Sequence, residues 1–467
     1  MRPFSSPLPR MAIPWRPVAT GGLGLLAIAA LAALLFALGL RGDRLAVVVI
    51  VGLCLWCWAT AWLPDLLVSL LLFFLLGTCT TLGPGVIFSG FASGAFWLVF
   101  SGAVLGLALT ATGLGDRVAA SLVARCGASY PRALAGFVAI AFLLSAIMPS
   151  TLGRIAILVP IVLRFADWVG LAAGRPGRSG LVLATALASC ELSSAILPAN
   201  LPNLVMAGSA EAILGLRLSY PDYAMLLLPA LVVLRGALLV GAGLLLFPDR
   251  PEPLPDPSPA ARLSPSEIRL LALLAGTLLL WLAEPWHGVA AGWVGLGAAI
   301  LCLGPARLVA TEQFLRSVKL QPLWFVAAIV GLTAAVDQSG LAAELGPWLR
   351  HIDIAALPPF IAYAALVVLS IGLTFAVTSN AAPALYTPLV PQLAAASGLA
   401  VKPVLLAQAI GFSTIALPYQ APPLVLAMAL AGIGLRDGSR YCLLVAGLSL
   451  VSVVPLNFAW WRLLGIV

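Results

Sequence analysis

The chain has 467 residues, of which 62% are hydrophobic and only 9% are charged, with a formal net charge of +8. Soluble domains carry about 25% charged residues, so this composition excludes a water-soluble globular protein. The basic excess has no soluble domain on which to form a nucleic-acid-binding patch. We attribute it to cytoplasmic loops of a membrane protein, whose lipid-facing surface the apolar residues supply.

Apolar segments recur along the whole chain, and each is long enough to cross ~30 Å of hydrocarbon as a helix. They lack strict alternation of polar and apolar residues, so they predict helices and not barrel strands. The continuous crossings are predicted at 20–40, 45–62, 65–80, 94–113, 222–246, 267–283, 288–304, 321–338 and 439–463. Residues 1–44 then comprise a cytoplasmic N-terminus and an uncleaved first helix of an inner-membrane, multi-pass protein.

Four further segments are apolar but interrupted by polar or proline residues. The pattern predicts two re-entrant hairpins, at 131–165 and 357–394, because each has a polar cluster at its centre. It also predicts two broken helices, at 180–212 and 401–432, because paired prolines remove backbone donors and clash with the preceding turn.

The second half of the chain repeats the first. Trp97 coincides with Trp324 after a shift of 227 positions, and Pro198 coincides with Pro418 after a shift of 220. The divisions are repeat 1 at 45–247, a Pro-rich polar linker at 248–266, and repeat 2 at 267–467. Five crossings per repeat is an odd number, which predicts inverted repeats. This topology places 17 of the 25 Lys and Arg residues on the cytoplasmic side, as the positive-inside rule requires.

The hairpin turns carry the first candidate ligands: Ser150 and Thr151 in one, and Ser379 and Asn380 in the other. Non-helical backbone at membrane depth is tolerated only where it is buried in protein or lines a cavity. Ser, Thr and Asn cap the helices that restart there, and helix N-termini favour anions. These side chains alone also suit simple helix capping; the symmetry of the two turns favours a binding site.

The helix breaks carry the second set of candidates. The first break reads ILPANLPNLV and the second reads ALPYQAPPLV, so Asn200, Asn203 and Gln420 lie among the prolines. Carbonyls freed by unwinding can coordinate a cation, and the restarted half-helix points its N-terminus at the substrate.

These residues resemble the divalent anion/sodium symporters, the citrate- and dicarboxylate-transporter-like permeases. The likeness covers the chain after about residue 45, including the stretch 91–119 before the first hairpin. The family has a Ser-Asn-Thr motif at each hairpin tip, in whose places this chain has Ser150-Thr151-Leu152 and Ser379-Asn380-Ala381. Its two proline breaks are matched at 199–203 and 420–423. Leu152, Ala381 and Ala421 replace family threonines, which bears on sodium coupling.

Five crossings per repeat and the extra first helix predict an all-α polytopic membrane protein with about 11 transmembrane helices, two inverted repeats, two re-entrant hairpins and two broken helices. The resemblance agrees with this architecture. It also implies a secondary transporter of di- or tricarboxylates or inorganic oxyanions, coupled to Na⁺ or H⁺ and needing no other cofactor. A hairpin domain would move like an elevator past a scaffold, in a homodimer. The predicted substrate-binding residues are Ser150, Thr151, Arg154, Asn200, Asn203, Ser379, Asn380 and Gln420. The predicted ion-coupling residues are Ser150, Thr151, Ala199, Glu191, Ser379, Asn380, Pro202 and Pro422, with Na⁺ at the hairpin tips.

Three ionisable residues lie at membrane depth: Arg154, Glu191 and Arg235. Intramembrane charges are costly and face a cavity or one another. We expect the planar donor fork of Arg154 to attract the anion and Glu191 to be a proton site. The competing interpretation is an internal Arg–Glu pair that only locks helices together.

Other functional classes fit less well. An enzyme is not expected, because both histidines lie in outer loops and the chain has no Gly-x-Ser-x-Gly elbow or phosphate-binding loop. The remaining alternatives are an arsenite permease, a Na⁺/H⁺ antiporter of the same superfamily and, in a different class, an ion channel.

Overall fold

The computed structural model describes residues 41–60, 62–114, 117, 129–148, 150–251, 263–318, 321–341 and 356–467, with scattered positions between 26 and 39. Within these ranges the chain is helical and contains no strand, which confirms the all-α prediction. The predicted first helix at 20–40, most of the linker at 248–266 and His351 lie wholly or largely outside the described residues.

Within the described part, five helices are long and apolar enough to cross a membrane, or up to seven if two bent helix pairs each count as one span. The five are Gly94–Thr112, Tyr220–Leu246, Pro265–Leu282, Pro359–Ala376 and Leu435–Leu463. Shorter apolar helices supply much of the remaining bundle. A multi-pass membrane protein is therefore confirmed, whereas the count of eleven crossings stays a prediction.

The helices described before the first hairpin are α2 (Gly42–Thr60), α3 (Asp65–Cys79), the short α4 (Pro84–Ile87) and α5 (Ser89–Ala92), and α6 (Gly94–Thr112). The second half has α14 (Pro265–Leu282), α15 (Glu284–His287), α16 (Ala291–Leu303), α17 (Thr311–Ser317) and α18 (Gln321–Gln338). Both α6 and α18 are followed by a glycine, Gly113 and Gly340, each with φ of +74°. This left-handed conformation is a common way to end a helix.

The predicted hairpins are pairs of helices that meet at a short turn. The first pairs α8 (Tyr130–Ile147) with α9 (Thr151–Trp168), and we call residues 148–151 tip 1. The second pairs α20 (Pro359–Ala376) with α21 (Ala382–Tyr386), a 3₁₀ turn and α22 (Val390–Ser397), and we call residues 377–381 tip 2. The second arm of this hairpin is segmented because Pro383, Pro388 and Pro391 each remove a backbone donor.

The two predicted broken helices are interrupted where the prolines lie. Helix α10 (Pro176–Glu191) gives way to 3₁₀ turns before α11 (Leu201–Leu214), and we call residues 192–200 break 1. Helix α23 (Val401–Phe412) stops before a 3₁₀ turn and α24 (Pro422–Ala431), and we call residues 413–421 break 2. Pro202 and Pro422 stand in the first turn of the restarted helices, where a missing N–H removes no helical bond.

Two more long helices complete the described bundle. Helix α12 (Tyr220–Leu228) passes through a π-helical stretch, Pro229–Leu234, into α13 (Arg235–Leu246). Helix α25 (Leu435–Leu463) runs on to the end of the chain. The π stretch changes the helical register immediately before Arg235, a local feature that often accompanies functional sites.

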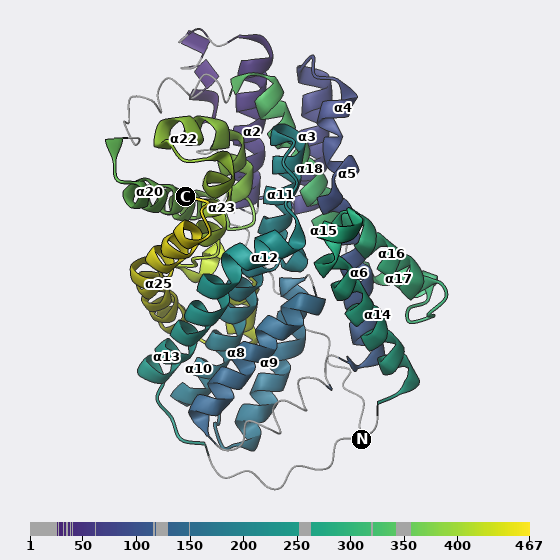
Figure 1. Cartoon of the computed structure of the whole chain (residues 1–467), viewed down its shortest axis with the longest axis vertical. Helices are drawn as coiled ribbons and strands as arrows, with labels where there is room; N and C mark the ends of the chain where they lie inside the picture. The colour runs from purple at the N-terminus through teal and green to yellow at the C-terminus, as the bar shows by residue number, and fades with distance from the viewer. Residues whose placement is uncertain are drawn as a thin grey trace.

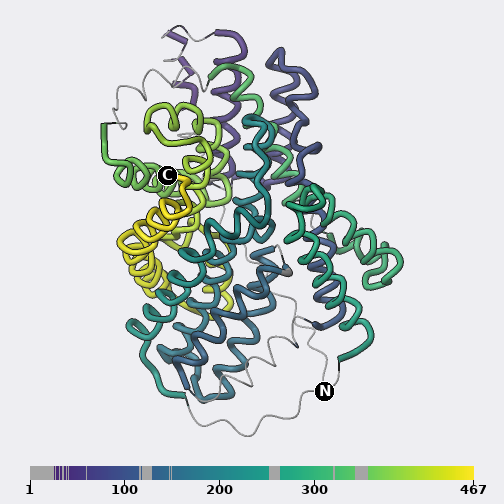
Figure 2. Tube along the Cα trace, in the orientation of Figure 1, coloured from purple at the N-terminus to yellow at the C-terminus, as the bar shows by residue number. Residues whose placement is uncertain are grey.

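Helix α10 lies at the centre of one group of helices, packed against α8, α9, α13 and α24 (Figure 1). Helix α18 lies at the centre of a second group with α2, α3, α5 and α11, whose traces run together in the upper part of the view (Figure 2). The buried apolar side chains divide accordingly into two hydrophobic clusters.

Close helix contacts depend on glycine at two positions. A Cβ at Gly411 on α23 would overlap the side chain of Ser370 on α20 and lie 2.9 Å from the carbonyl oxygen of Val367. A Cβ at Gly90 would likewise overlap the backbone of Ala327 on α18. Only glycine allows these backbones to approach so closely.

Two carboxylates stabilise helix starts. Glu267 and Ser264 form a capping box on α14, and Arg117 lies 2.5 Å from the Glu267 carboxylate. Burial acts to raise the pKa of Asp249, but hydrogen bonds from Arg175 and from the Gly177 and Arg250 amides outweigh it and lower that pKa.

Candidate functional site

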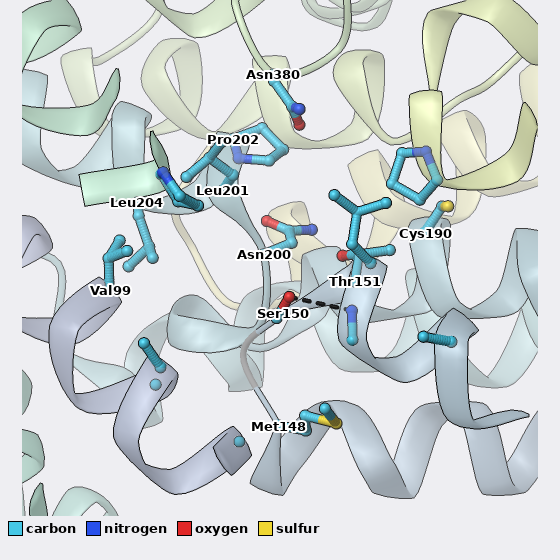
Figure 3. A pocket seen from close by; sticks show the side chains of 18 of the residues that line it. Val99, Met148, Ser150, Thr151, Cys190, Asn200, Leu201, Pro202, Leu204 and Asn380 are labelled. Carbon is cyan, nitrogen blue, oxygen red and sulfur yellow. Dashed lines mark hydrogen bonds between the residues drawn. The ribbon is translucent and has the colours of Figure 1, made fainter. Parts of the chain in front are cut away.

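A cavity of about 430 Å³ lies where the two tips, the two breaks and α6 come together (Figure 3). Its polar lining residues are Thr110, Ser150, Thr151, Cys190, Ser194, Asn200, Ser317, Ser379 and Asn380. The remaining lining is apolar or glycine and includes residues of α6, α9, α11 and α18. Four segments that are far apart in sequence thus contribute to one cavity.

Tip 1 brings Ser150 and Thr151 to the cavity because α9 restarts there. Ser150 is the N-cap residue, and its Oγ accepts the Gly153 amide at 3.1 Å. Thr151 Oγ1 accepts from Arg154 Nη2 at 3.0 Å. Each hydroxyl keeps its own proton available for a ligand.

Tip 2 brings Ser379 and Asn380 to the opposite part of the lining. The amide and Oγ of Ser379 both donate to the carbonyl of Gln420, at 3.0 and 2.9 Å. The Asn380 side chain extends toward Asn200 and Pro202 (Figure 3). Its amide makes no hydrogen bond with another described residue, so both its donors and its acceptor are available to a ligand.

Break 1 is held by two asparagines, of which one lines the cavity. Asn200 caps α11: its Oδ1 accepts the Asn203 amide at 3.0 Å, and its Nδ2 donates to Ser194 Oγ at 2.8 Å. Asn203 is fully buried behind the wall, where its Nδ2 donates to the carbonyl of Ile196 at 2.8 Å. The structure therefore places Asn203 in the support of the site and not in its lining.

Break 2 has a similar support in Gln420, which is also absent from the cavity lining. Its Oε1 accepts the amides of Ala416 and Leu417 at 2.8 and 2.7 Å. Its Nε2 donates to Thr374 Oγ1 on α20 at 2.6 Å. Both polar atoms of its side chain are hydrogen-bonded within the protein, so Gln420 organises break 2 from behind the cavity lining.

Arg154 does not reach the cavity, contrary to the expectation of a direct fork-like contact with the anion. Its side chain is 0% exposed and absent from the lining. The guanidinium donates to the carbonyl of Met148, to that of Ala199 at 2.9 Å and to that of Ser189 at 2.7 Å. These contacts, with the one to Thr151, bind tip 1 to break 1.

Glu191 forms an ion pair, but with Arg235 and not with Arg154. The Arg235 Nε and Glu191 Oε2 atoms are 3.8 Å apart, and both side chains are 0% exposed. Glu191 Oε1 accepts the amide of Ile415 at 3.1 Å, and Arg235 donates to Ser413 Oγ at 2.7 Å. The pair therefore connects α10 and α13 with break 2.

Of the backbone positions predicted to hold ions, some line the cavity and others do not. Pro202 lines the cavity, as does Pro423, whereas Pro422 does not. The carbonyl of Ala199 is occupied by Arg154.

Three polar lining residues, Thr110, Ser194 and Ser317, and the thiol residue Cys190 were not predicted. A signal for the α6 wall exists, because Gly102, Gly106 and Thr110 recur every four residues and share one helix face. Ser317, the last residue of α17, carries no such pattern.

The arrangement can bind an anion without a charged contact. Among the described residues, four helices of eight residues or more begin at the cavity: α9, α11, α18 and α24. Their N-termini carry partial positive charge, and the tips and break 1 add neutral donors. No Asp, Glu, Lys or Arg is found among the lining residues that the structure describes. The lining also offers no nucleophile with a base in reach.

Comparison with known proteins identifies relatives of the same kind. A membrane protein of Cupriavidus necator is 24% identical to this chain, over 83% of this chain and 78% of its own length. An L-tartrate/succinate antiporter of Escherichia coli (strain UTI89) is 26% identical over 72% of both chains. The YdaH transporter of Alcanivorax borkumensis has a similar fold, with a TM-score of 0.59 and 19% identity, over 86% of this chain and 97% of that one.

The named relatives are transporters and not enzymes, in agreement with the interpretation from sequence. The family model described as citrate transporter, CitMHS, matches residues 53–411, which is most of the chain. The resemblance to citrate- and dicarboxylate-transporter-like permeases is thereby confirmed, and the chain belongs to the citrate transporter family.

Proposed function

We propose that this protein is a secondary transporter that carries small carboxylate anions across the inner membrane. The observation that carries the proposal is the cavity that two hairpin tips and two helix breaks line together. Irregular backbone at such depth is characteristic of the midplane sites of secondary transporters. The N-terminus then lies in the cytoplasm, as the distribution of basic residues predicts.

The lining favours a carboxylate as the substrate. Asn380 and Asn200 offer amides, Ser150 and Thr151 offer hydroxyls, and the N-termini of α9, α11 and α24 add partial positive charge. A relative that exchanges L-tartrate and succinate supports a dicarboxylate. Apolar surface from α6 and α18 surrounds these donors, as in most small-molecule sites.

The mode of energy coupling is the next part of the proposal. Leu152 and Ala421 line the cavity where the resemblance has threonines, and neither side chain offers an oxygen to a hard cation such as Na⁺. We therefore propose exchange of one carboxylate for another as the first mode, in keeping with the antiporter relative. Uptake coupled to Na⁺ or H⁺ through backbone carbonyls at the tips is the second.

The contacts behind the cavity support a movement of the whole site. Arg154 joins tip 1 to break 1, Gln420 joins tip 2 to break 2, and the Glu191–Arg235 pair connects the two sides. We propose that these elements move together as an elevator within a homodimer, and that the halves are inverted repeats. The matching glycine stops after α6 and α18 support the repeat.

Counterflow in proteoliposomes tests the function. We expect vesicles loaded with unlabelled dicarboxylate to accumulate labelled succinate, tartrate or citrate with saturation, and sulfate and arsenite to serve as comparison substrates. Arms with and without Na⁺, and with and without a pH gradient, separate exchange from cation-coupled uptake. Flux that does not saturate would identify a channel, and exclusive transport of arsenite would replace the carboxylate assignment.

Cys190 offers an independent test of substrate position. It lines the cavity and is partly exposed there. In a variant whose other cysteines are replaced by serine, we expect a transported dicarboxylate to slow labelling of Cys190 by a small thiol reagent. Equal labelling with and without substrate would place the anion elsewhere.

A further inference from the structure

We infer that Arg154 is a buried positive charge whose counter-ion is the transported anion, although the guanidinium does not touch it. The inference rests on the proposed function, and it assigns Arg154 a positioning and electrostatic role in place of direct binding. Its basis is the set of charges immediately behind the cavity wall.

The partners of Arg154 are all neutral. Its guanidinium donates to the carbonyls of Met148, Ser189 and Ala199 and to the hydroxyl of Thr151. Its Nε is buried with no hydrogen-bond partner. In the part of the chain that the structure describes, no carboxylate lies within ion-pair distance of it. Buried arginines are ordinarily paired with an anion, because an uncompensated charge in low dielectric is costly.

The neighbouring charges do not compensate for Arg154. Glu191 is 3.8 Å from Arg235, so one negative charge meets one positive charge. Arg154, Arg235 and Glu191 together therefore carry a net charge of +1. The other buried Asp, Glu, Lys or Arg residue of the described ranges, Glu267, is paired with Arg117 at 2.5 Å.

The charged groups that carry this net charge lie directly behind residues that line the cavity. Arg154 Nη2 is 3.0 Å from Oγ1 of Thr151, a lining residue. Glu191 follows Cys190 in the chain and accepts the amide of Ile415, both of which line the cavity. Arg154 also stands in the first turn of α9, where the helix dipole has its positive end and adds to its field.

The cavity therefore has a positive potential without a positive side chain in its lining. An anion bound there is stabilised by Coulomb attraction that low dielectric screens only partly. The neutral donors of the tips then define its position, whereas the buried charge determines that it must be an anion. Binding, in turn, offsets the cost of burying Arg154.

Paired substitutions at Arg154 separate charge from hydrogen bonding. Arg154→Gln and Arg154→Lys both lose the donor fork, but only the Gln variant loses the charge. We expect KM for the transported dicarboxylate to rise about a hundredfold in Arg154→Gln and only about threefold in Arg154→Lys. Equal increases in both variants would show that Arg154 acts only as a clamp and would overturn the inference.

Glu191→Gln gives the opposite sign and does not depend on altering Arg154. It raises the net charge behind the wall from +1 to +2, so KM should fall below that of the wild type. An unchanged or higher KM, measured on protein that unfolds cooperatively, contradicts the inference even if the Arg154 variants do not fold.

The matched control is Arg164→Gln. Arg164 lies on the same helix but is exposed, and its removal changes the net charge of the chain by the same amount. Its KM should equal that of the wild type. Failure of wild-type counterflow would reject the proposed function, whereas wild-type counterflow with an unaltered KM in Arg154→Gln rejects only this inference.

Discussion

Tip 1 meets break 1 at one junction, and tip 2 meets break 2 at another. The two junctions satisfy their interrupted backbone with different side-chain chemistry. In each, interrupted backbone must find partners away from water. The first junction uses a charged side chain, Arg154, which donates to three carbonyls. The second uses the neutral Gln420, which accepts two amides and whose own carbonyl accepts from Ser379. Two junctions of similar build therefore differ in their electrostatics, and the unpaired positive charge lies at the first junction only.

The largest expected effect comes from breaking the pair that connects the junctions. Arg235→Gln leaves Glu191 buried without a charged partner, which should lower the free energy of unfolding by about 3–5 kcal/mol. The measurement is thermal or denaturant unfolding in detergent. The double variant with Glu191→Gln removes both charges and should recover most of the loss. A double variant as unstable as the single one would show that hydrogen bonds to Ser413 and Thr414, not the charges, stabilise the contact.

The neutral junction should show a smaller loss. Gln420→Leu leaves the buried amides of Ala416 and Leu417 without an acceptor, which should cost about 2–4 kcal/mol of unfolding free energy. Tyr419→Phe is the matched control, because Tyr419 is half exposed and loses one hydroxyl contact. Comparable losses in both variants would remove Gln420 from its role as the organiser of break 2.

Substitution of Asn380 tests a residue that lines the cavity, whereas the preceding variants alter residues behind the lining. Asn380→Ala removes an amide that no described residue uses, so stability should change by less than about 0.5 kcal/mol. KM for the dicarboxylate should rise about tenfold, because one donor to a charged group is lost. A variant with unchanged KM in counterflow would place the carboxylates away from tip 2.

The smallest expected effect is the loss of stability on substitution of Asp249, which lies outside both junctions. The pKa of Asp249 is lowered in the folded protein, so its contribution to stability is present above the ordinary pKa of about 3.9. That contribution is lost as the pH falls through the lower, folded pKa. Asp249→Asn should lower unfolding free energy by about 1 kcal/mol at neutral pH.

The check for Asp249 is the difference in melting temperature between wild type and variant, measured from pH 7 down to pH 3. That difference should shrink as the solution becomes acidic. A constant difference would mean that Asp249 stabilises the start of α10 without its charge.

Much of this fold is readable from the sequence, because proline and glycine act locally. Pro198 and Pro418 predict the two breaks, and polar clusters at Ser150 and Ser379 predict the hairpin turns, since each residue changes backbone bonding where it stands. The side chains that line the cavity follow in part from the same rule. The predicted domain boundaries and inverted topology remain predictions.

The partners of the buried charges could not be predicted in this way. Glu191 and Arg235 are 44 positions apart and lie on helices whose rotation depends on packing and on the π-helical stretch before Arg235. Arg154 is close in sequence to the tip, yet its direction is determined by carbonyls of a different segment, Ser189 and Ala199. Sequence spacing identifies which residues are near the site, whereas three-dimensional packing decides which of them face the ligand.

The glycine contact between α20 and α23 limits how any transport cycle can proceed. With no side chain at Gly411, the two helices touch backbone to side chain and have no space in which to slide apart. We therefore expect α20, the first arm of the second hairpin, and α23, the first part of the second broken helix, to move together in a transport cycle. The distance between two spectroscopic labels, one on α20 and one on α23, should be the same in the inward-facing and outward-facing states. Any hinge of the movement would then lie outside this contact.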